Sequence, residues 1–229
     1  MEIAGLVANS TVDFPKVLSA VVFTRGCNMN CFYCHNRSVF ELNAPLISEE
    51  QVWQFLRKRA GLLDGVVVSG GEPTLQTDLI QFIEKLKGLG YLVKLDTNGT
   101  APEVLAKLFE RRLLDYVAVD YKAPFERYKE ICRNDDVASL LRVFEMLKEC
   151  NVAWEVRTTM IPHITPLEYE QMAKETLPFK KYVLNRYIIP KKALPEDKLR
   201  LNLAPYTSRQ LEEIKQLVVK WQPNVCLND

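Results

Sequence analysis

The sequence predicts an α/β fold in which a parallel sheet is built from strands that alternate with helices. Three observations support this fold: short apolar runs, amphipathic stretches between them, and glycine, cysteine or polar residues where each run ends. Six strand–helix units can be counted in 229 residues, whereas a complete eight-unit barrel usually needs about 250 residues. We therefore expect an open, partial TIM-type barrel of about six βα units, with a flat doubly wound sheet as the alternative.

The first unit contains a buried strand and a capped helix. Val17–Thr24 is apolar and rich in β-branched residues, which predicts a strand buried on both faces. Ser48 is followed three residues later by Gln51, the spacing of a capping box. A helix is therefore expected to begin there and to continue towards Gly61.

The second and third units repeat this pattern. Gly65–Ser69 predicts a short second strand, and apolar residues recur at helical spacing through Thr77–Gly88. Tyr91–Leu95 predicts the third strand. A helix over Pro102–Arg112 should follow, because its proline suits the first turn of a helix.

The remaining elements follow from the same two periodicities. They are a strand at Tyr116–Val119, a helix at Ala138–Cys150, a strand at Trp154–Thr159, a helix from Thr165, a strand at Tyr182–Tyr187 and a helix at Thr207–Trp221. The lysine-rich stretch that ends near Asn202 is expected to be a loop. No repeat or linker composition separates the units, so residues 1–229 are expected to form one domain.

The unusual residues gather where the predicted strands end. Cysteines follow the first strand, Gly70-Gly71-Glu72 follows the second, Asp96-Thr97-Asn98-Gly99 the third and Asp120-Tyr121-Lys122 the fourth. The carboxyl ends of parallel strands face the same way, so these loops should converge on one rim of the sheet. The sequence therefore predicts a functional site at that rim.

The loop over residues 25–36 contains three closely spaced cysteines. Cys27, Cys31 and Cys34 can reach one inorganic centre only if the chain curls around it. A structural zinc site needs four protein ligands, and His35 is a poor fourth ligand because adjacent side chains point in different directions. A [4Fe–4S] cluster takes one cysteine per iron, so three cysteines would leave one iron open to a small molecule.

These residues resemble a known family. The Cys-x3-Cys-x2-Cys spacing with Tyr33 before the third cysteine resembles the radical S-adenosylmethionine (SAM) enzymes. Thr11-Val12-Asp13-Phe14-Pro15 and Cys34-His35-Asn36 are similar to the activating enzymes of glycyl-radical proteins. Over its whole length the chain most resembles the activases of the anaerobic ribonucleotide reductase.

The resemblance implies a SAM site around the open iron. In the family, the motif equivalent to Gly70-Gly71-Glu72 contacts the methionyl amine of SAM. Lys122 and Arg157 would place positive charge near the SAM carboxylate or ribose, although each could equally form an ion pair at the rim. The residues expected around SAM are Tyr33, His35, Gly70, Gly71, Glu72, Asp96, Asn98, Asp120, Lys122, Arg157 and Tyr187.

The resemblance also implies a monovalent cation beside SAM. In the pyruvate formate-lyase activating enzyme, two aspartates, a threonine and a backbone carbonyl hold such an ion. The matching positions here are Asp96, Thr97, Asp120 and the carbonyl of Ala118, and a hard cation suits oxygen ligands. The alternative is an Asx-type turn and a surface salt bridge.

The function implied is reductive cleavage of SAM by the cluster, which yields a 5′-deoxyadenosyl radical that generates a glycyl radical on a partner enzyme. That partner would be the anaerobic ribonucleotide reductase, and a flavodoxin or ferredoxin would supply the electron. Two other classes stay open. One is a radical SAM enzyme that acts on a small molecule, such as a deazapurine synthase, and the other is a non-catalytic metal-binding or redox module.

The composition narrows the partners and the compartment. The chain has 30 Lys and Arg against 29 Asp and Glu, so its net charge of +1 predicts no nucleic-acid partner. No signal-like start and no apolar run of about 18 residues occurs, so we expect a cytoplasmic protein without a membrane partner. Cys132, Cys150 and Cys226 show no ligand spacing and are expected to be reduced thiols.

Overall fold

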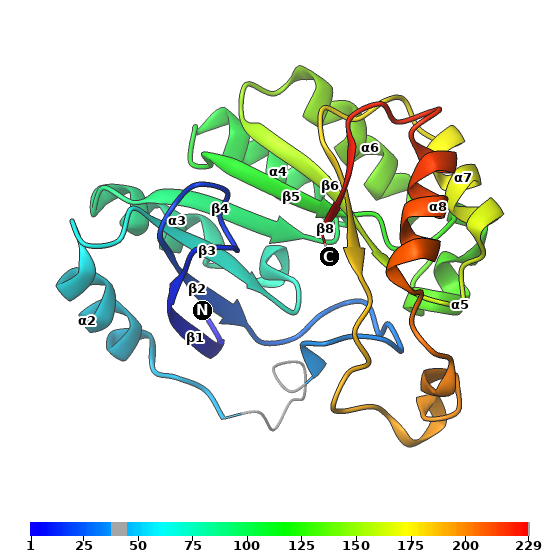
Figure 1. Cartoon of the computed structure of the whole chain (residues 1–229). Coiled ribbons are helices and arrows are strands. Elements are labelled where there is room, and N and C mark those ends of the chain that lie inside the picture. The colour runs from blue at the N-terminus through cyan, green and yellow to red at the C-terminus, as the bar shows by residue number, and fades with distance from the viewer. Residues whose placement is uncertain (38–44, 229) are drawn as a thin grey trace. The chain divides into compact units, whose positions relative to one another are not determined.

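The computed structural model describes residues 1–37 and 45–228 (Figure 1). The strands in this part of the chain are β1 Ile3–Ser10, β2 Ser19–Thr24, β3 Gly65–Gly70, β4 Leu92–Thr97, β5 Tyr116–Asp120, β6 Ala153–Met160, β7 Tyr182–Arg186 and β8 Val225–Asn228. The α-helices are α2 Glu49–Arg59, α3 Leu79–Gly88, α4 Pro102–Glu110, α5 Tyr128–Cys132, α6 Val137–Glu149, α7 Pro166–Lys174 and α8 Ser208–Val218. Short 3₁₀ helices are η1 Pro73–Leu75, η2 Phe125–Arg127, η3 Pro195–Asp197 and η4 Arg200–Asn202.

The strands form one open sheet in the order of the chain, from β1 to β8. β1 pairs with β2 in antiparallel fashion, whereas β2–β3, β3–β4, β6–β7 and β7–β8 are parallel. A doubly wound sheet contains a point at which the strand order reverses, and a barrel-type sheet does not. The sequential order therefore confirms the open barrel-type prediction over the flat alternative.

The chain divides into two compact units, each of which carries part of the expected site. The first comprises Met1–Asn28, Asn36–Ala118 and Ala138–Ala153, and the second comprises Met29–His35, Val119–Val137 and Trp154–Asp229.

The first unit is built on the buried valines of its parallel strands. Val21 lies opposite Val67 in the register of β2 and β3, and both pack with Phe14. The predicted capping box at the start of α2 is present, because the side chains of Ser48 and Gln51 each accept a bond from the other's backbone N–H. The local sequence therefore determines where this helix begins.

The second unit contains the parallel strands β6, β7 and β8 and the adjacent helices α7 and α8, which lie side by side (Figure 1). Both helices begin at capping boxes, Thr165 with Glu168 and Thr207 with Gln210. Pro166 occupies the first turn of α7, where its missing N–H costs no helical bond.

Two strands of the structure, β1 and β8, were not predicted from the sequence. β1 contains a glycine, shows register shifts against β2 and leaves Val7 exposed, so its apolar alternation is weak. β8 has only four residues. The stretch predicted as a lysine-rich loop contains η3 and η4, and β4 extends two residues beyond the prediction, so that Asp96 and Thr97 end the strand rather than follow it.

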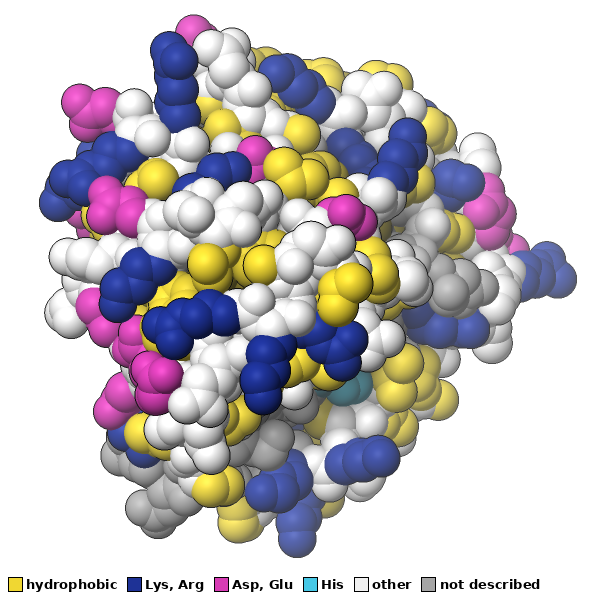
Figure 2. Space-filling view, turned by 90° about the vertical axis from the view of Figure 1, so that its left-hand side faces the viewer, with side chains coloured by type: hydrophobic (Ala, Val, Ile, Leu, Met, Phe, Trp, Pro, Cys, Tyr) yellow, Lys and Arg dark blue, Asp and Glu magenta, His cyan; other side chains and the backbone are white. Residues whose placement is uncertain are grey.

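The surface agrees with the near-neutral composition. On the face shown in Figure 2, Lys and Arg side chains occur together with Asp and Glu side chains and with hydrophobic ones. Within the described residues, none of the helices has the length and apolar character required to cross a membrane.

Candidate functional site

In the first unit, the loop after β3 lies directly against the start of the cysteine loop. Gly71 donates its N–H to the carbonyl of Thr24 at 3.0 Å, and Glu72 donates to that of Gly26 at 2.8 Å. A Cβ at Gly71 would lie 1.8 Å from the Gly26 oxygen, and one at Gly70, where φ is +124°, would lie 2.2 Å from the Thr24 nitrogen. Glycine is therefore required here for backbone packing, in addition to the close approach of a ligand that the sequence suggested.

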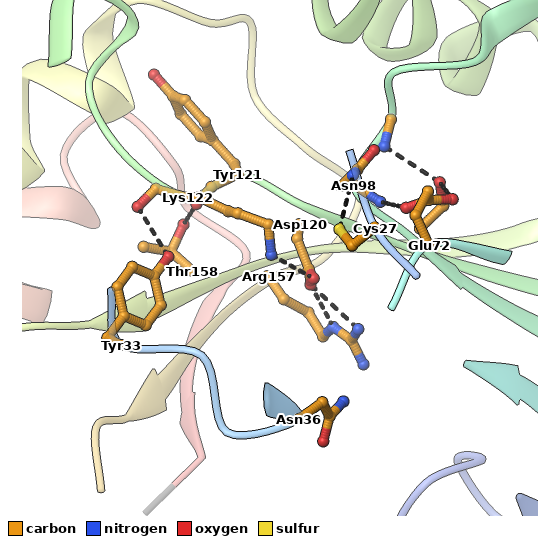
Figure 3. A network of polar contacts seen from close by, with 12 residues as sticks. Cys27, Tyr33, Asn36, Glu72, Asn98, Asp120, Tyr121, Lys122, Arg157 and Thr158 are labelled. Atoms are coloured by element: carbon orange, nitrogen blue, oxygen red, sulfur yellow. Dashed lines mark hydrogen bonds and ion pairs between the residues drawn. The ribbon is translucent and has the colours of Figure 1, made fainter. Parts of the chain in front are cut away.

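The carboxylate of Glu72 ties the end of β3 to the end of β4. The Glu72 side chain is fully buried. Its Oε1 accepts bonds from Thr74 Oγ1 at 2.7 Å and Thr97 Oγ1 at 2.8 Å. Its Oε2 accepts the backbone N–H of Asn98 at 2.6 Å, and Figure 3 shows this pair. Burial raises the pKa of Glu72, although the hydrogen bonds from Asn98, Thr74 and Thr97 oppose this effect.

Asn98 connects this carboxylate to the first cysteine. Its Oδ1 accepts the backbone N–H of Thr100 at 3.1 Å, which directs Nδ2 the other way. Nδ2 donates to Asn28 Oδ1 at 2.8 Å. It also donates weakly to Cys27 Sγ at 3.8 Å, a contact drawn in Figure 3. N–H donors to sulfur stabilise negative charge on a thiolate or on a bound cluster.

Asp96 lies beside a buried lysine. Lys94 and Asp96 are two residues apart on β4, so their side chains emerge on the same face. The Lys94 Nζ lies 2.6 Å from Asp96 Oδ1 and 5.9 Å from the ring centre of Tyr116. Thr97, the next predicted cation ligand, donates its hydroxyl hydrogen to Glu72 and accepts the N–H of Gly99 at 3.1 Å.

In the second unit, Asp120 is held by two cations. Lys122 Nζ donates to Asp120 Oδ2 at 3.0 Å, and Arg157 Nε donates to Oδ1 at 3.1 Å (Figure 3). Burial alone would raise the pKa of Asp120, but the charges of Lys122 and Arg157 outweigh it and lower the pKa to about 2. The ion pair that the sequence allowed as an alternative is therefore present.

Three predicted SAM contacts form an aromatic cluster in the second unit. The ring centre of Tyr187 lies 6.4 Å from that of Tyr33 and 6.3 Å from that of His35. The Tyr33 hydroxyl donates to the Lys122 carbonyl at 3.5 Å, a long bond. The Tyr187 hydroxyl is buried and has no hydrogen-bond partner within the described residues. A buried hydroxyl of this kind fits a polar atom of a bound ligand.

Burial lowers the pKa of His35, although a backbone hydrogen bond with Ile188 opposes this effect. His35 therefore favours the neutral form beside the aromatic rings.

All six cysteines lie in the described part of the chain and are thiols rather than disulfides. Cys31 is buried against the thiol of Cys132, and this hydrogen bond together with burial raises the pKa of Cys31 well above its usual value. The N–H of Cys34 bonds to the carbonyl of Cys31 at 3.2 Å, which folds the loop into a turn. The side chains of Cys27 and Cys34 are half-exposed.

These observations fit the chemistry of an iron–sulfur cluster. Three thiols lie in one short loop, and one of them already receives an amide N–H from Asn98. In the part of the chain that the structure describes, no three Cys, His, Asp or Glu side chains are arranged to hold a metal ion. The convergence of Cys27, Cys31 and Cys34 therefore stays a prediction.

Three further residues, Asn36, Cys132 and Lys94, are candidates for a role in the site, although the sequence did not indicate one. Asn36, at the end of the cysteine loop, donates to the carbonyl of Gly70 at 3.1 Å. Cys132 packs against Cys31 and accepts the N–H of Asn30 at 2.8 Å. The charged side chain of Lys94 within an apolar strand could have been noticed in the sequence. No local pattern around Cys132 indicates that it lies beside Cys31.

Comparison of the whole sequence with known protein families agrees with this fold and with these loops. The profile of the radical SAM superfamily matches residues 21–176, more than half of the chain. The chain belongs to the radical SAM superfamily. Its members are enzymes that use a [4Fe–4S] cluster and SAM, and these are the cofactors of this oxidoreductase.

A curated relative is similar over almost its whole length. It is the "Putative glycyl-radical enzyme activating enzyme MJ1227" of Methanocaldococcus jannaschii, 37% identical over 98% of this chain and 95% of that protein. A "Probable GTP 3′,8-cyclase" of Pyrococcus horikoshii is 32% identical over 43% of this chain and 32% of that protein.

Solved structures share the fold at low sequence identity. The chain named anSMEcpe, solved with bound AdoMet, superposes with a TM-score of 0.63 at 20% identity over 87% of this chain and 60% of that chain. A domain of a pyruvate-formate lyase-activating enzyme from Bacteroides vulgatus has a TM-score of 0.57 at 16% identity, over 72% of this chain and 99% of that domain.

Proposed function

We propose that this protein is an activating enzyme that installs a glycyl radical on a larger partner enzyme. The observation that carries the proposal is the 37% identity to the M. jannaschii activating-enzyme relative, which extends over 98% of this chain and 95% of that protein. The match therefore extends beyond residues 21–176, the region shared with the radical SAM superfamily as a whole.

In this proposal, Cys27, Cys31 and Cys34 bind the cluster. When bound, the cluster supplies the electron that cleaves SAM into methionine and a 5′-deoxyadenosyl radical, which takes a hydrogen atom from a glycine of the partner. Asn98 donates to the Cys27 sulfur and stabilises its negative charge.

The other proposed residues position SAM. Glu72 holds the glycine loop and the Asn98 backbone in place through its four accepted hydrogen bonds. The aromatic cluster of Tyr33, His35 and Tyr187 contributes an apolar wall for the nucleoside. It also contributes the Tyr187 hydroxyl, which bonds to none of the described residues. Excluding water from such a wall protects a reactive radical. The remaining proposed SAM contacts are Gly70, Gly71, Asp96, Asp120, Lys122 and Arg157.

We propose the anaerobic ribonucleotide reductase as the partner and a flavodoxin or ferredoxin as the electron donor. The stretches Gly61-Leu62-Leu63-Asp64-Gly65 and Lys94-Leu95-Asp96-Thr97-Asn98-Gly99 support this partner through their resemblance to its activases. A low-potential iron–sulfur centre needs a donor of comparably low potential.

The test is anaerobic reconstitution of the purified protein with iron and sulfide. We expect roughly four irons per chain, SAM-dependent release of 5′-deoxyadenosine, and a glycyl-radical signal in electron paramagnetic resonance only after the anaerobic reductase is added. Cys31→Ala should lose the cluster and all product, and Cys150→Ala should keep both. SAM cleavage without a radical on the reductase would reject this partner, and a cluster retained by Cys31→Ala would reject the ligand assignment.

A radical SAM enzyme acting on a small molecule is the second candidate. Its support is the similarity to the GTP 3′,8-cyclases, but the match covers only 32% of the P. horikoshii protein. Incubating the reconstituted protein with SAM and GTP separates the two proposals, because a cyclase would consume GTP without any protein substrate.

A further inference from the structure

A lysine side chain is buried in the middle of β4. Lys94 is 1% exposed. It lies opposite Val67 in the register of β3 and β4, and Val67 belongs to the apolar cluster with Phe14 and Val21. The Tyr116 ring, which packs against the same cluster, faces the Lys94 ammonium. The Lys94 side chain therefore lies beside apolar and aromatic side chains.

Within the described residues, this ammonium forms an ion pair with Asp96, whose Oδ1 lies 2.6 Å away. A buried ion pair is weak evidence for stability, because desolvating two charges costs about as much as their attraction returns. An aliphatic residue would pack against Val67 and Tyr116 without that cost. Stability alone therefore does not explain the Lys94–Asp96 pair. A function that requires a carboxylate with a balanced charge at the end of β4 explains it better.

The other carboxylate of the expected cation site is balanced in the same way. Asp120 receives Lys122 on one oxygen and Arg157 on the other. Thr97 uses its hydroxyl hydrogen on Glu72 and accepts from Gly99. Each of the three side chains that the resemblance assigns to a metal cation, Asp96, Thr97 and Asp120, is thus already bonded to another group of the chain within its own unit.

We infer that the Lys94 ammonium takes the charge-balancing role that the resemblance gives to a monovalent metal ion, so that this enzyme needs no potassium or sodium ion. This inference rests on the proposed SAM site. A fixed ammonium carries the same unit charge as potassium, and its covalent link to β4 removes the entropic cost of capturing an ion from solution. The Asp96 carboxylate consequently keeps this cationic partner whatever salt is present.

The first test needs only the native enzyme. The reconstituted protein is assayed for 5′-deoxyadenosine formation in potassium, sodium and tetramethylammonium chloride at one ionic strength, since tetramethylammonium is too large for a metal site. We expect rates within about twofold of each other, because only general screening changes. A rate that falls tenfold or more without potassium and sodium (about 1.4 kcal/mol) would overturn the inference.

The second test removes the ammonium. Lys94→Ala leaves a cavity next to an unbalanced carboxylate, so we expect it to lose about tenfold in rate in tetramethylammonium chloride. Potassium or ammonium ions should restore much of that loss. Lys87→Ala is the matched control, because it removes a lysine that pairs with Asp115 at 2.7 Å in the same unit. Its rate should not respond to the choice of cation.

If Lys94→Ala loses all activity, thermal unfolding of the cluster-free protein still tests the inference. The melting temperature of the cluster-free Lys94→Ala protein should rise when potassium replaces tetramethylammonium, and that of the native protein should not. The double variant Lys94→Met with Asp96→Asn removes both charges and should be insensitive to the cation. A native protein stabilised by potassium, or a Lys94→Ala protein that ignores it, would count against the inference. Failure of the proposed function looks different, since no variant would then cleave SAM in any salt.

Discussion

The backbone N–H of Asn98 donates to Oε2 of Glu72 at 2.6 Å, across 26 residues of sequence. The side chain of the same asparagine donates to the sulfur of Cys27. A single residue therefore joins the glycine loop after β3, the loop after β4 and the first cysteine of the cluster loop. A substitution at Glu72 should therefore also alter the position of Asn98 beside Cys27.

Replacing Glu72 by glutamine tests that connection. The amide oxygen can keep the bonds to Thr74 and Thr97, but the NH₂ group would then face the Asn98 N–H donor. We expect the free energy of unfolding to fall by about 1–3 kcal/mol, together with weaker cluster retention, measured by urea denaturation and iron content. Glu84→Gln is the control, because its ion pair with Arg111 is exposed. Equal behaviour of the two variants would contradict this role for Glu72.

Gly71→Ala tests whether the glycine loop needs glycine for packing alone. Its Cβ would lie 1.8 Å from the Gly26 carbonyl oxygen, and backbone must move to relieve that contact. We expect a loss of about 1–3 kcal/mol in unfolding free energy even without cofactors. In contrast, Gly88→Ala, on α3 with open space around the added carbon, should stabilise the protein by about 0.4–1 kcal/mol. A stable, cofactor-free Gly71→Ala protein would leave ligand approach as the sole reason for this glycine.

Tyr187→Phe tests the unpartnered hydroxyl. Removing a hydroxyl that bonds to no described residue should leave the stability of the cofactor-free protein within about 0.5 kcal/mol. We expect the KM for SAM to rise several-fold, because the hydroxyl would pair with SAM when it binds. Tyr91→Phe should do the opposite: its hydroxyl donates to the Leu56 carbonyl at 2.7 Å, so stability should fall while KM is unchanged. An unaltered KM in Tyr187→Phe would remove Tyr187 from the SAM site.

The Asp120 ion pairs predict a specific pH dependence. The folded-state pKa of Asp120 is lowered from 3.8 to about 2, so its ionised form stabilises the folded protein. That contribution is complete above the unfolded-state pKa and is lost as the pH falls through the folded-state pKa. We expect Asp120→Asn to be less stable at pH 7 by on the order of 1–2 kcal/mol, since partial exposure reduces the full value. The difference between the two proteins should shrink from pH 5 towards pH 2, and a constant difference would contradict the assignment.

Much of the fold could be predicted because its signals are local. Capping boxes at Ser48, Thr165 and Thr207 mark helix starts through bonds that span three residues. Buried parallel strands appear as apolar runs, and polar residues at their ends mark the rim. β1 and β8 were not predicted because each is an edge strand that is stabilised by pairing with its neighbour rather than by a clear pattern of its own. β1 pairs with Val21 and Phe23 of β2, and β8 pairs with Leu184 of β7.

The sequence by itself determined the chemistry of this protein: three thiols within eight residues, and the glycine and acidic motifs at successive strand ends. Only the tertiary structure decided how those groups pack and bond to one another within each unit. It packed Gly71 against Gly26, joined Glu72 to Asn98 and placed Cys132 beside Cys31. Contacts between residues distant in sequence depend on how the strands and loops pack, and a local sequence pattern carries no information about that packing.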